Sequence, residues 1–228
     1  MRLDKFLSEA GAASRRELKR IIKSGRVTVD GAVVKSPEMK IDETAGRVTL
    51  DGQPVTLRRT VVLMLHKPAG YVTSTRDPRD RTVMELLPPE YRDLFPVGRL
   101  DKDTEGLLLF TNDGDLAHRL TAPKRQVEKE YYAETEGQVD EADIRAFREG
   151  IVLRDGTRCL PAELRPAENG GCCVVVREGK YHQVRRMLAA RGKPVTYLRR
   201  IREGHLILGG LEKGSCRLLD PEEVGKLL

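Results

Sequence analysis

The stretch Val97–Phe110 constrains the fold of this chain more than any other. A turn rich in charge and glycine, residues 98–106, runs directly into the apolar residues Leu107–Phe110. A run of this length is typical of a buried strand and is too short for a helix. The three carboxylates within residues 101–105 are therefore predicted to lie on a loop that a buried strand holds in place, as rigid scaffolds hold catalytic loops.

Three interpretations of these carboxylates compete. The first is an acidic turn in solvent, the usual environment of Asp and Glu. The second is a calcium loop, because Asp101-x-Asp103-x-Glu105 resembles the start of an EF-hand loop. That loop needs a bidentate Glu at its twelfth position, where this chain has Asn112, and its second half here is apolar, so calcium is rejected. The third is a catalytic carboxylate held in place by Arg99 or by a distant cation.

Charge is distributed unevenly along the chain. The 228 residues carry a net charge of +6, with 39% hydrophobic and 33% charged residues, which suits one or two soluble globular domains. Residues 1–60 hold 13 Lys and Arg against 8 Asp and Glu, whereas the rest of the chain holds 28 against 27. A basic excess confined to one end predicts a polyanionic partner for that end.

Several classes of protein are disfavoured. No run approaches the ~18 apolar residues of a membrane span, and the N-terminus lacks the apolar core of a signal peptide, so we expect a cytoplasmic protein without membrane contact. The chain has neither a glycine-rich phosphate loop nor a His/Cys cluster, and its four cysteines lack metal-binding spacing. We therefore expect no cofactor, no metal site, and cysteines that are reduced and structural.

The hydrophobic patterns predict an α+β protein with a small N-terminal domain, residues 1–58, and a larger domain, residues 60–228. In the first, we expect a helix at 2–10, a helix from Ser14 to Gly25 with Glu17 completing a capping box, strands at 26–29 and 47–50 that each lead into an Asp-Gly turn, and a linker at 53–60. In the larger domain, we expect strands at 61–65, 107–110, 160–164, 172–176, 195–198 and 205–208, and another that begins at residue 129. We expect helices at 83–87 and 140–149, a helix capped by Asp115, and helices that begin at His182 and at Asp220.

Three motifs extend the interpretation over nearly the whole chain. The first is Gly98-Arg99-Leu100-Asp101, followed by Thr104–Leu109; the second is Lys129-Glu130-Tyr131, and the third is Glu178–Met187. Together they resemble the motifs of the RNA pseudouridine synthases, and most closely those of the family that modifies ribosomal RNA of the small subunit. The resemblance implies one mixed, mostly antiparallel sheet with a cleft in the larger domain.

The resemblance also implies a role for each motif. Asp101 would be the essential carboxylate, Tyr131 would pack against the target base, and Arg185 would pair with Asp101 to keep it charged and oriented. The target base would have to be flipped out of its stack to be reached. The residues expected to contact RNA around this site are Arg99, Lys129, Lys180, His182, Gln183 and Arg186.

The N-terminal domain resembles the small RNA-binding domain named after ribosomal protein S-four, also called the αL motif. In that domain a pair of helices and the strand after them face the phosphates of RNA. By position, the phosphate-facing residues would be Arg2, Lys5, Ser14, Arg15, Arg16, Lys19, Lys23 and Arg26.

The resemblance as a whole implies that the protein isomerises one uridine of 16S ribosomal RNA to pseudouridine, within an assembling small subunit. We expect it to act as a monomer. Thr104-Glu105-Gly106 and Tyr181-His182-Gln183 favour this target over 23S RNA, because the similar large-subunit branch more often has Ser for that Glu and Asn-Arg-Glu for that Tyr-His-Gln. Two other classes stay open: a non-catalytic RNA-binding protein of the ribosome carried by residues 1–60, and a metal-dependent phosphoryl-transfer enzyme that uses the carboxylates of residues 101–105.

Overall fold

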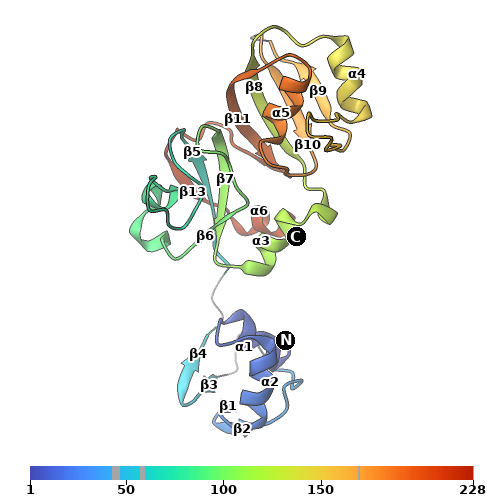
Figure 1. The fold of residues 1–228 in the computed structure, drawn as a ribbon. Coiled ribbons are helices and arrows are strands. Elements are labelled where there is room, and N and C mark those ends of the chain that lie inside the picture. The colour runs from blue at the N-terminus through green and yellow to red at the C-terminus, as the bar shows by residue number, and fades with distance from the viewer. Residues whose placement is uncertain (43–46, 57–59, 169, 228) are drawn as a thin grey trace. The chain divides into compact units, whose positions relative to one another are not determined.

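The computed structural model describes residues 1–42, 47–56, 60–168 and 170–227. The chain forms two compact units, Met1–Thr60 and Val61–Leu228, drawn in blue and in green to red in Figure 1. The two arginines of the expected linker, at 58 and 59, lie outside the described residues.

The N-terminal unit is a pair of helices packed on a small antiparallel sheet. Its elements are α1 (Leu3–Glu9), α2 (Arg15–Lys23), β1 (Val27–Val29), β2 (Ala32–Val34), β3 (Val48–Leu50) and β4 (Gln53–Val55). The strands are ordered β2-β1-β3-β4. The linker prediction was wrong at residues 53–55, because this segment pairs with β3 as the last strand of the sheet. Pro54 is tolerated there because an edge strand has one side free of ladder hydrogen bonds.

Local sequence signals account for the turns of this unit. The predicted capping box is confirmed, since the backbone N–H of Glu17 donates to the Ser14 hydroxyl and the Glu17 carboxylate accepts from the backbone N–H of Ser14. Asp30 and Asp51 both have positive φ angles, of 52° and 50°, and each is followed by a glycine that also has positive φ. Two successive residues of positive φ make the tight turn that Asp-Gly favours between antiparallel strands.

The C-terminal unit is built on a single mixed sheet. Its strands are β5 (Val62–Lys67), β6 (Phe95–Val97), β7 (Glu105–Thr111), β8 (Lys129–Thr135), β9 (Glu163–Pro166), β10 (Cys172–Val176), β11 (Val195–Glu203), β12 (Leu206–Ile207) and β13 (Cys216–Leu218). Its helices are the 3₁₀ segments η1 (Val83–Leu86), η2 (Pro89–Tyr91) and η3 (Pro123–Arg125), and α3 (Gly114–Thr121), α4 (Glu141–Glu149), α5 (Gln183–Ala190) and α6 (Pro221–Lys226).

The order of the strands confirms the predicted sheet. The main path is β13-β5-β7-β11-β8-β10-β9, with β6 paired to β7 and β12 paired to β11. Within the described part of the unit, β7 and β11 pair in parallel and the other paired strands are antiparallel. This parallel pairing joins one half of the sheet, around β5 and β7, to the other half, around β8 and β10.

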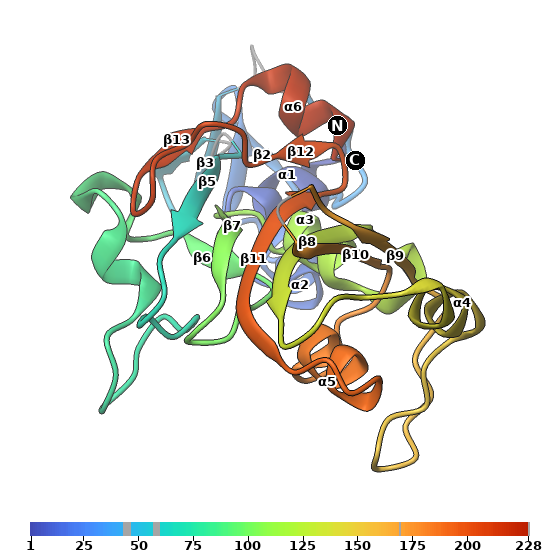
Figure 2. The ribbon, with the colours of Figure 1, turned by 90° about the horizontal axis from the view of Figure 1, so that it is seen from above.

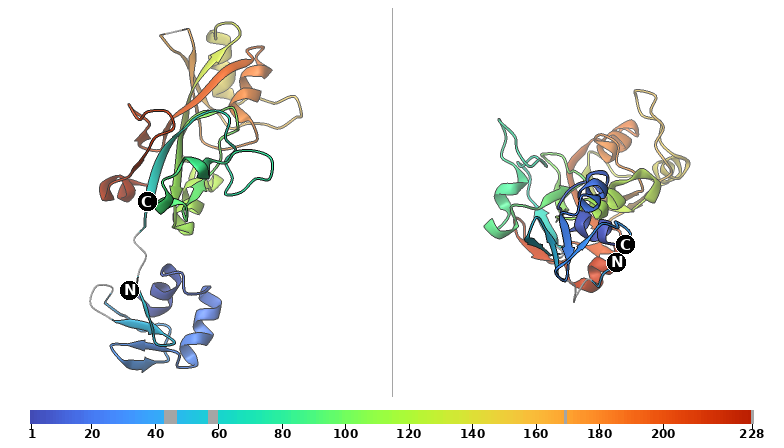
Figure 3. Two further views of the ribbon diagram at one scale, coloured as in Figure 1. Left: turned by 90° about the vertical axis from the view of Figure 1, so that its left-hand side faces the viewer. Right: turned by 90° about the horizontal axis from the view of Figure 1, so that it is seen from below.

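Strand β7 is apolar on both faces because both faces are covered. Leu107 and Leu109 belong to a buried cluster with Leu116 of α3, and α6 also packs against this cluster. Leu108 and Phe110 belong to a second buried cluster on the other side. Strands covered on both faces are nearly continuously hydrophobic, which is why four apolar residues follow one another here. Figure 3 shows α6, in dark red, near the C-terminus at this end of the unit.

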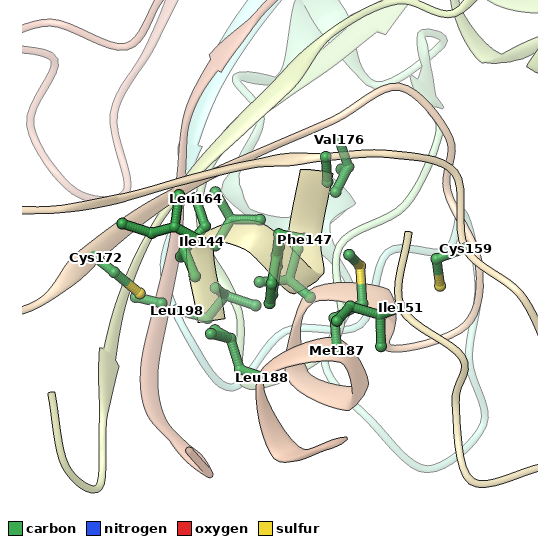
Figure 4. Close-up of a cluster of buried hydrophobic side chains, with 14 of the residues drawn as sticks. Ile144, Phe147, Ile151, Cys159, Leu164, Cys172, Val176, Met187, Leu188 and Leu198 are labelled. Atoms are coloured by element: carbon green, nitrogen blue, oxygen red, sulfur yellow. The ribbon is translucent and has the colours of Figure 1, made fainter. Parts of the chain in front are cut away.

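Helices α4 and α5 pack against the other half of the sheet (Figure 2). Figure 4 shows the resulting core, in which Ile144 and Phe147 of α4 and Met187 and Leu188 of α5 meet Leu198 of β11. Strand β11 therefore packs against α5 while it pairs with β7. The core thus fixes α5, and the turn before it, against the same sheet that carries the loop at residues 98–104.

The four cysteines, Cys159, Cys172, Cys173 and Cys216, are all free thiols. Cys159 and Cys172 are buried and the other two are half-buried. Burial raises the pKa of every one of these thiols, and it raises that of Cys172 to about 11.

Several predicted boundaries were wrong. Strand β7 begins at Glu105 instead of Leu107, so Glu105 belongs to the sheet and not to the loop. Asp113, not Asp115, caps α3, because its carboxylate accepts from the backbone N–H of Leu116. The strand expected at 160–164 is β9, at Glu163–Pro166, because the backbone N–H of Ala162 first donates to the Phe147 carbonyl of α4.

The helices of the described residues are short. None of them combines the length and the apolar character that crossing a bilayer requires.

Candidate active site

A buried lysine holds the loop that carries Asp101. Lys67, at the end of β5, is fully buried, and its Nζ donates to the backbone carbonyls of Asp101, Lys102 and Thr104 at 2.8–3.2 Å and to that of Pro68 at 3.1 Å. Burial lowers the pKa of Lys67 to about 8, although nearby carboxylates oppose this effect. Three carbonyls of one loop thus converge on a single ammonium group, and this convergence fixes the backbone on either side of Asp101.

Glu105 anchors the other end of the loop. Its carboxylate accepts from the Tyr197 hydroxyl at 2.8 Å and from Lys213 Nζ at 2.8–2.9 Å, and more weakly from the backbone N–H of Ala69 at 3.4 Å. Burial opposes the charged form of Glu105, but the hydrogen bonds outweigh it, and the pKa is lowered. Burial and this carboxylate together raise the pKa of Tyr197 to about 12.

Asp101 and Tyr131 line the same cavity, which has a volume of ≈ 440 Å³. Leu198 and Val184 contribute apolar walls, while Arg99 and Lys129 bring positive charge. Burial lowers the pKa of Lys129. A cavity of this size with a few convergent polar groups is typical of a small-molecule or nucleotide site.

A buried ion pair supports Tyr131 from behind. Arg200 of β11 lies opposite Tyr131 of β8 in the sheet register, and each of the two side chains influences the pKa of the other. The same guanidinium donates to the Leu107 carbonyl at 2.7 Å and lies 3.3 Å from a carboxylate oxygen of Glu203. Burial alone would lower the pKa of Arg200, but Glu203 and Tyr131 outweigh it and raise the pKa. The cation is therefore retained in the interior. Burial raises the pKa of Tyr131, which keeps its hydroxyl neutral.

The partner predicted for Asp101 was wrong. Arg185 forms its ion pair with Asp103, at 2.9 Å, and His182 Nε2 lies 3.4 Å from Asp101 Oδ1. The cause is the backbone of His182, which has φ 47° and ψ 37° and precedes the first helical residue of α5. This left-handed residue turns the imidazole toward Asp101, while Arg185, in the first turn of α5, reaches the next carboxylate along the loop.

The other predicted RNA contacts of the third motif, Glu178–Met187, have different surroundings. Gln183 is buried, its amide oxygen accepts from the backbone N–H of Lys180 at 2.9 Å and its amide nitrogen donates to Glu178 at 2.8 Å, so it stabilises the turn. Lys180 pairs with Glu178, and Arg186 pairs with Asp155 at 2.5 Å. Lys180, His182 and Gln183 line the cavity, and Arg186 does not.

The three carboxylates of residues 101–105 face different partners. Asp101 lies at His182, Asp103 at Arg185, and Glu105 at Tyr197 and Lys213. Within the described ranges, no group of three or more His, Cys, Asp or Glu side chains could hold a metal ion. This arrangement disfavours the phosphoryl-transfer interpretation, which needs the carboxylates to converge.

The N-terminal unit presents a basic face on α2. The exposed residues Arg15, Arg16, Lys19 and Lys23 form no ion pair among the residues that the structure describes. Other predicted RNA-binding residues are engaged within the unit: Arg2 pairs with Asp4 and Arg26 with Asp51, Lys5 lies 3.6 Å from Glu9, and Ser14 serves the capping box.

Sequence reasoning missed three residues of the site. Lys67 was not among the predicted site residues; its position directly after a buried strand was the available signal. Tyr181 lies inside the third motif, and its exposure had no signal in the sequence. Arg200 follows Arg199 in a strand, and nothing in the pattern distinguished the buried arginine from its half-buried neighbour.

Models of two known protein families match the chain. The one described as RNA pseudouridylate synthase matches residues 61–190, and the one described as the S4 domain matches residues 1–45. The first match covers the loop of Asp101, Tyr131 of β8 and α5, which together enclose the cavity.

Full-length relatives carry the same description. The chain is 42% identical over 231 residues to an uncharacterised RNA pseudouridine synthase of Bacillus subtilis, with 98% of this chain and 97% of that protein covered. It is also 42% identical over 231 residues to a protein of Vibrio cholerae named ribosomal small subunit pseudouridine synthase A, with 100% and 99% covered.

A solved structure gives the same answer from the fold. A crystal structure of a pseudouridylate synthase matches with a TM-score of 0.72 and 34% identity, over the whole of both chains. Because the family model covers more than half of the chain and the relatives align end to end, the protein that places Asp101 and Tyr131 in one cavity belongs to the RNA pseudouridine synthases.

Proposed function

We propose that this protein converts one uridine of 16S ribosomal RNA to pseudouridine, with Asp101 as the essential carboxylate. The observation that carries the proposal is that Asp101 and Tyr131, from two separate motifs, line one cavity. The name of the Vibrio cholerae relative supports the small subunit as the source of the RNA. Single-stranded or splayed bases are the RNA elements that such a site can reach, which favours an assembling subunit as the substrate.

The reaction suits the groups that are present. The N1–C1′ bond of uridine breaks, the base turns, and a C5–C1′ bond forms, while C5 loses a proton and N1 gains one. Atoms and electrons balance without a further reactant. Asp101 supplies the carboxylate that acts on the sugar or the base, and the ring of Tyr131, which lies opposite Arg200 in the sheet, forms a wall for the detached base. Lys67 and Glu105 keep the loop of Asp101 in place.

Access to the uridine requires that the base leaves its stack, at a cost of roughly a few kcal/mol. Phosphate contacts would offset this cost. The basic face of α2 and the exposed Arg99 at the cavity are the groups we assign to those contacts.

The test is to incubate unmodified 16S and 23S ribosomal RNA, free and in assembling subunits, with the protein and to map pseudouridine in each. One new site in 16S RNA is expected. A single new site in 23S RNA would show that the proposed reaction is right and the proposed substrate is wrong. No new site in either RNA would refute the proposal. Deletion of the gene, followed by the same mapping, checks the result in cells.

A further inference from the structure

A second cavity adjoins the one described above. It has a volume of ≈ 420 Å³ and is lined on one side by residues 72–74 and Asp77. Arg99, Asp101, Tyr181 and His182 line both cavities. The two spaces therefore meet at the carboxylate proposed to react.

Tyr181 lies where the cavities meet and is 72% exposed. Its ring stacks on that of His182, with centroids 3.9 Å apart and planes at 15°. One face of the tyrosine ring is thus covered and the other faces solvent. An aromatic ring with a free face beside an RNA-modifying site offers a nucleobase a stacking surface.

The charges of the second cavity favour a base over a phosphate. Two carboxylates, Asp77 and Asp101, line it together with Lys102, and Lys102 is already paired with Asp80 at 2.5 Å. Arg99 is exposed and has no ion-pair partner among the described residues. Since Arg99 borders both cavities, it is suited to the phosphate that would join a nucleotide in one to a nucleotide in the other.

We propose that the second cavity binds the nucleobase next to the target uridine, stacked on the free face of Tyr181, with the intervening phosphate on Arg99. This inference rests on the proposed function, because it assigns the target uridine to the first cavity. The enzyme then reads two consecutive nucleotides of an unpaired segment, and Tyr181 separates them.

The experiment uses a short RNA around the mapped uridine, made intact or with an abasic residue on its 5′ or its 3′ side. Initial rates are measured for the full-length wild type, Tyr181→Phe and Tyr181→Ala. On one side only, loss of the base should lower kcat/KM of the wild type roughly tenfold, mainly through KM, as expected for one lost base–aromatic stack. Tyr181→Phe, which keeps the ring, should show the same penalty.

The Tyr181→Ala protein makes the result decisive. On intact RNA it should lose a similar factor, and the abasic residue should then lower its rate less than twofold further, because the partner of the base is gone. Equal abasic penalties in wild type and Tyr181→Ala, or no penalty on either side, would overturn this inference alone. Absence of any new pseudouridine in the mapping experiment on 16S and 23S RNA would instead overturn the proposed function, and this inference with it. A melting temperature equal to that of the wild type separates a lost contact from a lost fold.

Discussion

Asp101 and Asp103 are two residues apart, yet they have different surroundings. Asp101 lines both cavities beside His182, whereas the side chain of Asp103 is 68% exposed and pairs with Arg185. Only the first can touch a base in the cavity that Tyr131 lines.

Replacement of each aspartate by asparagine separates the two roles. Asp101→Asn should abolish pseudouridine formation, because the amide has no charged oxygen to act on the sugar or the base, while RNA affinity and fold stay nearly unchanged. Asp103→Asn should cost far less, since it loses an exposed ion pair. Single-turnover assays on the same RNA measure both variants. Turnover of Asp101→Asn close to that of the wild type would remove this residue from the mechanism.

Lys67 should affect activity without touching the substrate. In Lys67→Met the apolar stem is kept, but the carbonyls of Asp101, Lys102 and Thr104 lose their shared donor. Displacement of a reacting group by about 1 Å can lower a rate on the order of 100-fold, so we expect a fall in kcat of that size with KM little changed. Steady-state kinetics beside circular dichroism measure the effect, and an unchanged kcat would show that the loop keeps its place unaided.

At this scale the motifs predicted the position of Asp101 and Tyr131 in one site. The partners of Asp101 and Arg185 were not predictable, because the helix was expected to begin at His182, whereas the backbone of His182 is left-handed and the helix begins at Gln183. A left-handed residue before the first turn changes the direction of every side chain that follows. No residue in Tyr181–Gln183 indicates that His182 adopts this conformation. The buried Arg200 was hidden for another reason: its burial depends on Tyr131 and Glu203, which are distant from one another in the sequence.

At the scale of elements, β7 joins the two halves of the sheet at one tight contact. Gly106 has φ 108°, and a Cβ built on it would lie 2.1 Å from the backbone oxygen of Arg200. The parallel pairing of β7 with β11 thus needs a residue without a side chain at this point.

Gly106→Ala should therefore destabilise the C-terminal unit by more than about 3 kcal/mol, because backbone atoms must move and the φ angle is unfavourable for alanine. Gly210→Ala is the matched control, since its Cβ would meet open space. Urea unfolding followed by circular dichroism compares the two. Similar stabilities of the two variants would mean that β7 and β11 can move apart at Gly106 without a loss of stability.

Glu105, the first residue of β7, predicts a dependence on pH. Its folded pKa lies below the ordinary 4.5, so the charged carboxylate stabilises the fold above pH 4.5, and this contribution is lost as pH falls through the folded pKa. Glu105→Gln should lower the free energy of unfolding at pH 7 by about 1.5–3 kcal/mol, the range for hydrogen bonds to charged groups. The difference in the free energy of unfolding between the variant and the wild type should become smaller below pH 4.5. A difference that stays constant down to pH 3 would show that the charge of the Glu105 carboxylate is not its cause.

Elements with strong local signals were the predictable ones. The apolar run of β7, the capping box of α2, and the Asp-Pro start of α6 each appear where their residues indicate. The short strands β6 and β13 were missed, because three residues carry no periodicity and such strands form only through pairing with β7 and β5. Pairing across the chain, not propensity, determines them.

At the scale of the whole molecule, the excess of positive charge lies in the N-terminal unit, as a basic face on α2. The cavity of Asp101 lies in the C-terminal unit. Substitution of Arg15, Arg16, Lys19 and Lys23 by Gln in the full chain should weaken RNA binding. It should also reduce the slope of log K against log salt by up to about 3, given ~0.7 per phosphate contact on single strands. Lys226→Gln, whose ammonium already pairs with Glu222 at 2.6 Å, is the control. Binding isotherms at several salt concentrations would reveal an unchanged slope if the RNA is held elsewhere.

The thiols of this protein have a practical consequence. Alkylating reagents attack the thiolate, and burial disfavours that form at Cys159, Cys172, Cys173 and Cys216 alike. A new cysteine at an exposed position, such as Val33→Cys on β2, would react first. A single fluorophore can then be attached to the N-terminal unit of the otherwise native chain, and its emission reports when that unit meets RNA, separately from the chemistry at Asp101.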